Sequence, residues 1–387
     1  MALRVAIVAD DLTGALDAAA PFATRGLHTL VAATPDALDL ALAEKPEVLA
    51  VNTVSRHASP QAAAARVRDT FQRLLSQTPD ILLKKIDSTL RGPVGAEVAA
   101  AASSSQRRAL ICPAVPAQGR CVRHGRLLVN GRPLRETAAG RDPRAAVPED
   151  DLAKLLETTL GETTVVDANG PWPRTDNLVA DADTADALSS LARRMLPEAR
   201  QWLPVGASGL AEALADTAFG PPNLTPAPNP EPPAVFVVGS RTETTHSQVH
   251  ALRHRHEVTH LRAPGGRLDC RTSPGPGPTL LTVPDDEDAC DAETVAACLA
   301  ESAARLIRQK VPGLLVVTGG DTALALLGVL DATLVTVRGE FEAGVVHACI
   351  RVQERTVPLI TKAGGFGGPE LFTDLLSWTG FTAGPSK

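Results

Sequence analysis

The chain contains few aromatic residues. Its 387 residues include no tyrosine, three tryptophans and eight phenylalanines, and aromatic residues make up 3% of the total. Proteins that bind single strands of nucleic acid usually stack the bases on aromatic side chains. The formal net charge is −6 at pH 7, whereas nucleic-acid-binding domains usually carry a basic surface. The sequence therefore predicts no nucleic-acid partner.

Long apolar runs and paired cysteines are also missing. No apolar stretch approaches the roughly 20 residues that a membrane-spanning helix needs. The first residues, MALRVAIVADD, meet two aspartates too early for a secretory signal. The six cysteines are scattered without a Cys-x-x-Cys pair, so we expect neither a disulfide framework nor a zinc ribbon. These features predict a cytoplasmic protein with no membrane partner.

Several familiar cofactor motifs do not occur. The Walker A motif and the Gly-x-Gly-x-x-Gly fingerprint are both missing, which disfavours the P-loop NTPases and the usual nicotinamide-dependent dehydrogenases. Four histidines lie between His250 and His260, but no His-Glu-x-x-His pattern accompanies them. A zinc site needs further well-placed ligands, so we interpret this group as a basic helix end and predict no metal ligands among these histidines.

Three apolar segments in the last third of the chain each run into a glycine-containing turn. They are residues 314–322 (LLVVTGGDT), 234–240 (AVFVVGS) and 357–368 (VPLITKAGGFGG). Glycine allows the backbone to approach a ligand closely, and a helix N-terminus attracts anions. Ligands of doubly wound sheets bind at the carboxyl ends of the strands. The three turns therefore predict one nucleotide phosphate site, the alternative being tight turns that bind nothing.

Polar residues follow three apolar segments in the N-terminal half. Asp10 and Asp11 follow residues 4–9, Arg56 follows residues 49–54, and Asp87 follows residues 81–86. Arginine binds carboxylates through paired hydrogen bonds, and serine and aspartate can hold hydroxyls. This cluster predicts a site for a small, hydroxylated, negatively charged molecule. The alternatives are a helix cap at one of the two aspartates and a salt-bridged helix start.

Two adjacent lysines and the spacing of the aspartates refine this interpretation. Strand alternation sends Lys84 and Lys85 to opposite faces, so we expect only one of them to face the site. A haloacid-dehalogenase phosphatase would need Asp-x-Asp after the first strand, but position 12 is leucine. A response-regulator receiver would need an aspartate at the end of a later strand, where Asn52 stands. Both classes therefore fit poorly.

A proline-dense stretch divides the chain. Residues 220–233 (GPPNLTPAPNPEPP) disfavour both helix and central strand, and we interpret them as a linker. The sequence predicts an α/β protein of two domains, residues 1–219 and 234–387, each with a mostly parallel sheet flanked by helices. An arginine-rich hairpin arm is expected near residues 116–143, with turns at His124-Gly125 and Asn130-Gly131.

Six motifs together resemble the four-carbon acid sugar kinase family (D-threonate, D-erythronate and 3-oxo-tetronate kinases). They are ADDLTG (9–14), KIDSTLRG (85–92), PAVPAQGR (113–120), VGS (238–240), TGGDT (318–322) and KAGGFG (362–367). The motifs run in order along nearly the whole chain. The resemblance implies that the N-terminal domain binds the acid sugar, that the C-terminal domain binds ATP, and that the active site lies in the cleft between them.

The resemblance also implies roles for individual residues. It implies substrate contacts from six residues: Asp11, Arg56, Lys85, Ile86, Asp87 and Ser88. We add Asp10 and Arg91 because they belong to the same polar cluster. ATP contacts are expected from the three glycine turns: Ser240, Gly319, Gly320, Asp321, Thr322, Gly364 and Gly365. The sequence departs from the family at residues 206–209, which read GASG where GSAG is expected, so Ser208 receives no role.

These observations predict an ATP-dependent kinase that phosphorylates the C4 hydroxyl of D-threonate, giving 4-phospho-D-threonate. D-erythronate and 3-oxo-tetronate are the alternative substrates, and a non-catalytic sugar-acid or nucleotide-binding regulator is the alternative of another class. Arg56, Arg91 and one lysine would fix the carboxylate, and Asp11, or else Asp87, would orient or deprotonate the hydroxyl. Mg²⁺ would bridge the phosphates with help from Asp321. A homodimer is expected from base rates.

Overall fold

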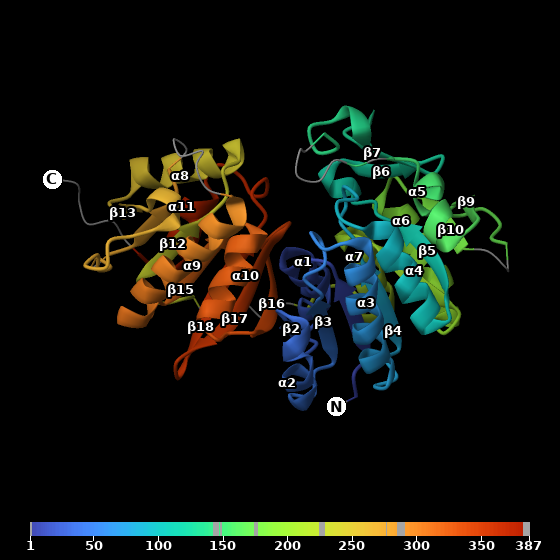
Figure 1. Cartoon of the computed structure of the whole chain (residues 1–387), viewed down its shortest axis with the longest axis horizontal. Helices are drawn as coiled ribbons and strands as arrows, with labels where there is room; N and C mark the ends of the chain where they lie inside the picture. Colours follow the sequence, from blue (N-terminus) through green and yellow to red (C-terminus); the bar gives the residue numbers. More distant parts are fainter. Residues whose placement is uncertain are drawn as a thin grey trace. The chain divides into compact units, whose positions relative to one another are not determined.

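The computed structural model describes residues 2–141, 147, 149–173, 177–223, 229–275, 277–284 and 291–381. The chain forms two compact units, Met1–Leu224 and Thr225–Lys387, and helices flank the sheet in each (Figure 1). Part of the expected linker, residues 224–228, lies outside the described residues.

The sheet of the first unit is parallel throughout. Its strands lie in the order β2-β3-β1-β4-β11-β5-β10-β9. Their bounds are β1 Val5–Ala9, β2 Thr29–Ala32, β3 Val48–Asn52, β4 Ile81–Lys85, β5 Arg108–Cys112, β9 Thr163–Asp167, β10 Asn177–Asp181 and β11 Trp202–Gly206. The central strands are buried along their whole length, as expected for a parallel sheet covered by helices on both faces.

Helices of the first unit pack on one another in pairs as well as on the sheet. Helix α1 packs on α7, and α3 packs on α4. Their bounds are α1 Leu12–Ala23, α2 Leu38–Ala43, α3 Pro60–Leu75, α4 Val94–Ser105, α5 Leu152–Leu160, α6 Ala185–Met195 and α7 Ser208–Phe219, with short 3₁₀ turns at Pro35–Ala37, Pro116–Gln118, Leu134–Glu136 and Leu196–Glu198. Helix α3 begins at Pro60, because Ser59 caps it and proline suits the first helical position.

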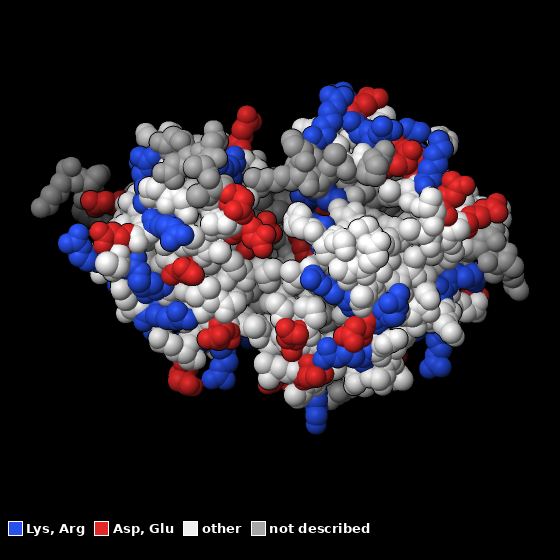
Figure 2. All heavy atoms as spheres, in the orientation of Figure 1, with Lys and Arg blue, Asp and Glu red and all other residues white. Residues whose placement is uncertain are grey.

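The arm is a small antiparallel sheet of β6 (Arg120–Arg123), β7 (Arg126–Val129) and β8 (Arg132–Pro133). Both predicted turns are confirmed, since His124-Gly125 and Asn130-Gly131 all have positive φ, as type I′ turns require. Ladder contacts of Val122 with Ala182 join the arm to the rest of the unit. Arg123 pairs with Asp183 and Arg126 pairs with Asp150. The two signs of charge are interspersed over the face shown in Figure 2.

The second unit has a mixed sheet in the order β13-β14-β12-β15-β18-β17-β16. The strands up to β18 are parallel, and β16 and β17 form an antiparallel hairpin. Their bounds are β12 Ala234–Val238, β13 Thr259–Arg262, β14 Thr279–Thr282, β15 Leu314–Thr318, β16 Leu334–Glu342, β17 Val345–Val352 and β18 Arg355–Lys362. The predicted mostly parallel sheet is thus extended by a hairpin that the prediction lacked.

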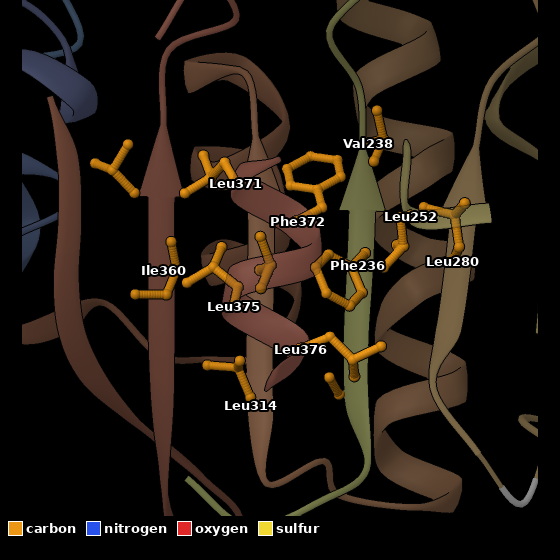
Figure 3. Close-up of a cluster of buried hydrophobic side chains, with 13 residues drawn as sticks. Phe236, Val238, Leu252, Leu280, Leu314, Ile360, Leu371, Phe372, Leu375 and Leu376 are labelled. Atoms are coloured by element: carbon orange, nitrogen blue, oxygen red, sulfur yellow. The ribbon is translucent and has the colours of Figure 1, made fainter. Parts of the chain in front are cut away.

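Helices of this unit are α8 Glu243–Arg255, α9 Ala292–Gln309, α10 Gly320–Val329 and α11 Leu371–Trp378, with a 3₁₀ turn at Pro264–Gly266. Figure 3 shows α11 laying Phe372, Leu375 and Leu376 over the strands, and Phe372 contacts Phe236 with ring centroids 5.3 Å apart. This core anchors the strands whose carboxyl ends carry the glycine turns. In the part of the chain that the structure describes, no helix is long and apolar enough to cross a membrane.

A buried ion pair links β4 to α4 in the first unit. Lys84 Nζ lies 2.9 Å from Glu97 Oε2, and the two side chains are 0% and 2% exposed. Lys84 also donates to the carbonyl of Lys85 at 2.8 Å, and the hydroxyl of Ser55 donates to the Glu97 carboxylate. Lys84 therefore has a structural role, and its ammonium group is occupied by buried partners.

Replacing Lys84 with methionine should lower the free energy of unfolding by roughly 3–5 kcal/mol, because the Glu97 carboxylate would stay buried without its cation. Urea unfolding of the whole chain measures this loss. The Lys84→Met/Glu97→Leu double variant should recover most of it, since it removes both charges. A single variant as stable as the wild type, or a double variant no better than the single one, would contradict this assignment.

Candidate active site

Loops from neighbouring strands meet at the carboxyl edge of the first sheet. Ala9 is in register with Asn52 on one side and with Lys85 on the other, and Lys85 pairs with Gly206 of β11. Residues that follow these strands therefore lie side by side. This register brings Asp10, Asp11, Arg56 and Asp87 together, as the sequence predicted.

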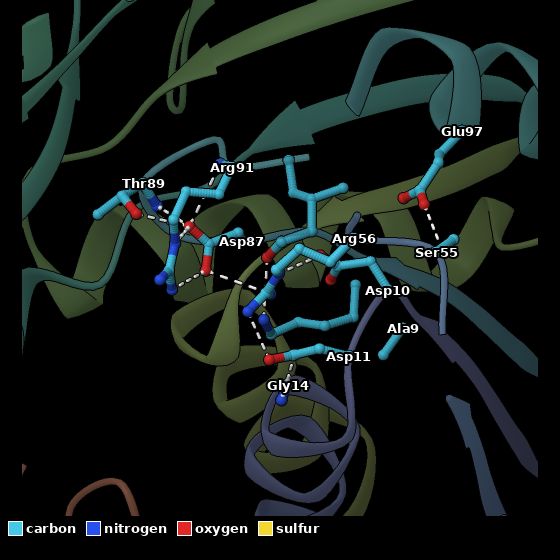
Figure 4. Close-up of polar contacts among 12 residues, drawn as sticks. Ala9, Asp10, Asp11, Gly14, Ser55, Arg56, Asp87, Thr89, Arg91 and Glu97 are labelled. Carbon is cyan, nitrogen blue, oxygen red and sulfur yellow. Dashed lines mark hydrogen bonds and ion pairs between the residues drawn. The ribbon is translucent and has the colours of Figure 1, made fainter. Parts of the chain in front are cut away.

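Arg56 lies at the centre of this cluster (Figure 4). Its Nε donates to Asp10 Oδ2 at 2.7 Å, its Nη1 donates to Asp11 Oδ2, and its Nη2 lies 3.3 Å from Asp87 Oδ1. The side chain of Arg56 is 11% exposed. One guanidinium thus holds three carboxylates from two other loops. Arg56 therefore holds these three carboxylates in place, in addition to any contact that it makes with a substrate.

Asp87 has most of its acceptor capacity occupied. Its carboxylate accepts hydrogen bonds from the backbone N–H and hydroxyl of Thr89, and it accepts two from the Arg91 guanidinium at 3.0 and 2.8 Å. Burial alone would raise the pKa of Asp87, but Arg56 and Arg91 together hold that pKa well below its usual value. Because this carboxylate is so firmly ionised, it is a weak proton acceptor.

The two neighbouring aspartates differ from each other. Burial raises the pKa of Asp11 above its usual value, against the effect of Arg56, and the adjacent Asp10 carboxylate adds to the rise. Burial acts on Asp10 in the same direction. The positive charges of Arg56, Lys84 and Lys85 outweigh this effect, so the pKa of Asp10 lies below its usual value. Asp11 is therefore a better proton acceptor than Asp10, and also than Asp87, the other predicted catalytic residue.

Asp11 also caps α1. Its Oδ1 accepts a hydrogen bond from the Gly14 backbone N–H at 2.7 Å, so the helix-cap interpretation is confirmed for Asp11. The cap uses one carboxylate oxygen and Arg56 uses the other. The two interactions fix the direction of the carboxylate, which a positioned base needs.

The remaining predicted substrate contacts follow β4. The two lysines lie on opposite faces of β4, as expected, and Lys84 pairs with Glu97. Lys85 points toward α1 instead, since a Cβ on Gly14 would lie 3.0 Å from its Nζ. Lys85 Nζ also donates to the Ile86 carbonyl at 2.9 Å. Ile86 is buried and contributes its backbone. Ser88 is half-buried, and the Arg91 side chain is 38% exposed. Lys85 is therefore the lysine that faces the predicted site.

The three glycine turns of the second unit converge, as predicted. Val238 is in register with Thr318, and Thr318 is in register with Lys362, so β12, β15 and β18 end side by side. The Ser240 backbone N–H lies 3.4 Å from the hydroxyl of Thr318, and the Gly319 N–H donates to the Lys362 carbonyl at 3.1 Å. Gly320, Asp321 and Thr322 form the first turn of α10.

Close backbone packing explains the glycines. A Cβ on Gly239 would lie 2.0 Å from the Thr322 hydroxyl, and one on Gly364 would lie 2.1 Å from the Ser240 hydroxyl. Gly319 has φ of +93°, which disfavours any other residue, and offers no side chain to cap α10. The turns thus present backbone N–H groups and hydroxyls at a helix N-terminus, a combination that suits phosphate.

Residues of α8 hold the glycine loop after β18, a support that the sequence did not reveal. Gln248 is buried and donates to the carbonyls of Phe366, Gly367 and Gly368 at 3.0, 3.1 and 2.9 Å. Lys362 Nζ donates to the Gly364 carbonyl at 2.9 Å, and burial lowers the pKa of this lysine to about 8. A loop rich in glycine therefore has a defined shape.

A cavity of about 350 Å³ borders this cradle and falls in the range of ligand sites. Ser240 lies on its wall, and basic side chains of α8 and β13 line it, among them His250, Arg253 and Arg262. His260 lines it too, whereas His254 and Arg255 form the basic last turn of α8 that the sequence predicted. Among the described residues, no group of His, Cys, Asp and Glu has the arrangement of a metal site.

Two family models match the chain. Residues 5–214 match a family model described as a sugar-binding N-terminal domain, and residues 279–372 match one described as a nucleotide-binding C-terminal domain. A D-threonate kinase of Bordetella bronchiseptica is 35% identical over 94% of both chains. A 3-oxo-tetronate kinase of Methylobacterium radiotolerans is 29% identical over 96% of this chain and 98% of its own.

A solved structure from Bordetella bronchiseptica, a domain-swapped dimer with bound citrate, is 31% identical and covers 97% of this chain and 98% of its own, with a TM-score of 0.52. The breadth of these matches, over both halves, agrees with the two sites described above. The chain belongs to the four-carbon acid sugar kinase family and is a phosphotransferase with an alcohol group as acceptor.

Proposed function

We propose that the protein transfers the γ-phosphoryl group of ATP to the C4 hydroxyl of D-threonate, giving 4-phospho-D-threonate. The observation that carries this proposal is the presence, in one chain, of the Arg56 cluster in the first unit and the glycine cradle in the second. The relative of 35% identity named a D-threonate kinase favours that acid. D-erythronate and 3-oxo-tetronate are the alternative substrates, the latter favoured by the relative of 29% identity.

The substrate half supplies charge and hydrogen bonds. Arg91 and Lys85 provide positive charge for the carboxylate, since Arg91 is partly exposed and Lys85 reaches the edge of the sheet. Arg56 holds Asp11 and contacts the substrate from the same edge. Ser88, Asp10 and the backbone of Ile86 complete the set of predicted contacts.

Asp11 accepts the proton of the attacking hydroxyl in this proposal. The O–H bond breaks as the new bond from oxygen to the γ-phosphorus forms, and the bond from the γ-phosphorus to the ADP oxygen breaks. Phosphoryl transfer depends mainly on positioning and charge stabilisation, so the fixed direction of Asp11 contributes together with its capacity to accept the proton. Asp87 keeps Arg56 and Arg91 in place.

ATP lies on the cradle in this proposal. Its phosphates contact a set drawn from all three turns: Ser240, Gly319, Gly320, Asp321, Thr322, Gly364 and Gly365. Mg²⁺ is usually held by phosphate oxygens, water and one or two carboxylates, and it neutralises charge during transfer. Asp321, exposed in the first turn of α10, is the carboxylate that fits this role.

We also propose a homodimer, on the grounds that the Bordetella bronchiseptica relative was solved as a domain-swapped dimer.

Release of ADP from Mg-ATP in the presence of D-threonate, L-threonate, D-erythronate, L-erythronate and 3-oxo-tetronate tests the proposal. We expect turnover that depends on the acid and is fastest with D-threonate. If turnover is fastest with another acid, that acid is the substrate and D-threonate is not. Binding of ATP and acid without ADP release would favour the non-catalytic regulator.

Asp11→Asn should lower kcat by about 10²- to 10⁴-fold, the usual contribution of a general base, with KM for the acid changed only a few-fold. The asparagine oxygen can still cap α1, so the helix start should survive, which circular dichroism checks. Undiminished turnover in a folded Asp11→Asn enzyme would exclude Asp11 as the base.

Gly365→Ala tests the cradle without disturbing the free protein. A Cβ at Gly365 meets nothing within 4 Å, so the variant should fold normally, yet it should weaken ATP binding several-fold by occupying the space of the nucleotide. Gly328→Ala on α10, where a Cβ also meets nothing, is the matched control and should leave ATP affinity unchanged. Equal ATP affinity of the Gly365→Ala variant and wild type, by isothermal calorimetry, would remove Gly365 from the site.

A further inference from the structure

Helix α1 carries one carboxylate that the proposed mechanism does not use. Every residue from Leu12 to Ala23 is buried except Thr13 and Asp17. These two are four positions apart and therefore share one face of the helix. Because α1 begins immediately after Asp11, this face opens at the carboxyl edge of the first sheet. A carboxylate here, in a helix otherwise built of apolar side chains, requires an explanation.

Asp17 lies beside the group that faces the proposed substrate. Gly14 precedes it by one turn on the same side of α1, and a Cβ on Gly14 would lie 3.0 Å from Lys85 Nζ. The Lys85 ammonium thus lies against the helix next to Asp17, and the two groups interact electrostatically. Arg120 at the start of the arm acts on Asp17 as well.

A neutral hydroxyl also acts on Asp17. Helix α7 packs on α1, and the hydroxyl of Ser208 at the start of α7 lowers the pKa of the Asp17 carboxylate. Packing fixes Ser208 in place, because a Cβ on Gly206 would lie 2.4 Å from the Cys112 carbonyl and one on Gly209 would lie 2.5 Å from the Ala114 carbonyl. Both Asp17 and Ser208 are half-buried, so rigid elements hold them where a small ligand can reach them.

A structural ion pair does not account for this arrangement. Asp87, which has a structural role, is bonded directly to two guanidinium groups. Asp17 instead interacts with Lys85 and Arg120 only electrostatically. Burial raises the pKa of Asp17 above its usual value, although Lys85 and Ser208 lower it. An additional hydrogen-bond donor would stabilise this carboxylate, and a hydroxyl of a sugar acid is such a donor.

We propose that Asp17 and Ser208 bind a hydroxyl of the four-carbon acid and select its stereoisomer, while Lys85 holds the carboxylate side. This inference rests on the proposed function. Stereoisomers of a tetronate differ only in the direction of a hydroxyl, so discrimination needs acceptors fixed on rigid elements, here α1 and α7. A site built to bond a substrate hydroxyl rejects a ligand that leaves its polar groups unpaired.

Asp17→Asn is the principal test, with kcat and KM measured for D-threonate and D-erythronate and acid affinity measured by calorimetry. Asparagine can still accept a hydrogen bond from Ser208, so the helix contact should be kept. We expect KM for the preferred acid to rise about 10- to 100-fold, the usual effect of losing a hydrogen bond to a charged group. We expect kcat and KM for ATP to change less than about threefold, which fits a binding role. The preference between the two acids should shrink.

Two further variants sharpen the test. Ser208→Ala should shift KM and acid preference in the same direction by a smaller factor. Asp80→Asn replaces an exposed aspartate just before β4, at the opposite edge of the same sheet, and should change neither quantity.

The outcomes separate this inference from the proposed function. Wild-type protein that binds no tetronate would overturn both. Equal acid affinity and preference of wild type and Asp17→Asn would overturn the role of Asp17 alone. A fall in kcat with unchanged KM would also overturn it, because Asp17 would then act in the chemical step.

Discussion

The carboxyl ends of parallel strands decide where charge lies in this protein. In the first unit, β3, β1 and β4 end in register, so the loops that follow them place Asp10, Arg56 and Asp87 within hydrogen-bonding distance. Burying so many charges is costly unless each is paired. Arg56 meets this need by serving three carboxylates with one guanidinium. Its presence allows a half-buried edge to keep Asp11 with a raised pKa beside two carboxylates of lowered pKa.

The second unit uses the same strand ends for a different purpose. Its loops carry glycine where the first unit carries charge, and the hydroxyls of Thr322 and Ser240 pack directly against the loop backbone as a result. Such loops lose much conformational entropy on folding. Gln248 and Lys362 offset this loss by hydrogen bonding to loop carbonyls. The cradle is thus shaped by buried side chains of α8 and β18, and its own residues are left to face the ligand.

Much of this organisation could be predicted from the sequence. The apolar segments at residues 314–322, 234–240 and 357–368 were predicted to run into glycine turns, and they contain the carboxyl ends of β15, β12 and β18, because unbroken apolar runs mark buried strands clearly. The hairpin of β16 and β17 was missed, since register shifts between Val337 and Gly339 and between Glu340 and Glu342 interrupt its regular pairing. The strand Thr29–Ala32 was missed because four residues give too short a pattern. The sequence did not single out Asp17, because a single aspartate in an alanine-rich helix resembles a solvated position until its neighbours are known. The partners of Arg56 were equally hidden, since they depend on register between distant strands.

The most direct test of the account is the position of the phosphate in the product. The enzyme should be incubated with Mg-ATP and the acid that supports turnover, and the product examined by ³¹P and ¹H nuclear magnetic resonance. The account predicts a phosphomonoester whose phosphorus couples to the two C4 methylene protons. A phosphate coupled to the C2 or C3 proton, or inorganic phosphate released with the acid unchanged, would contradict it.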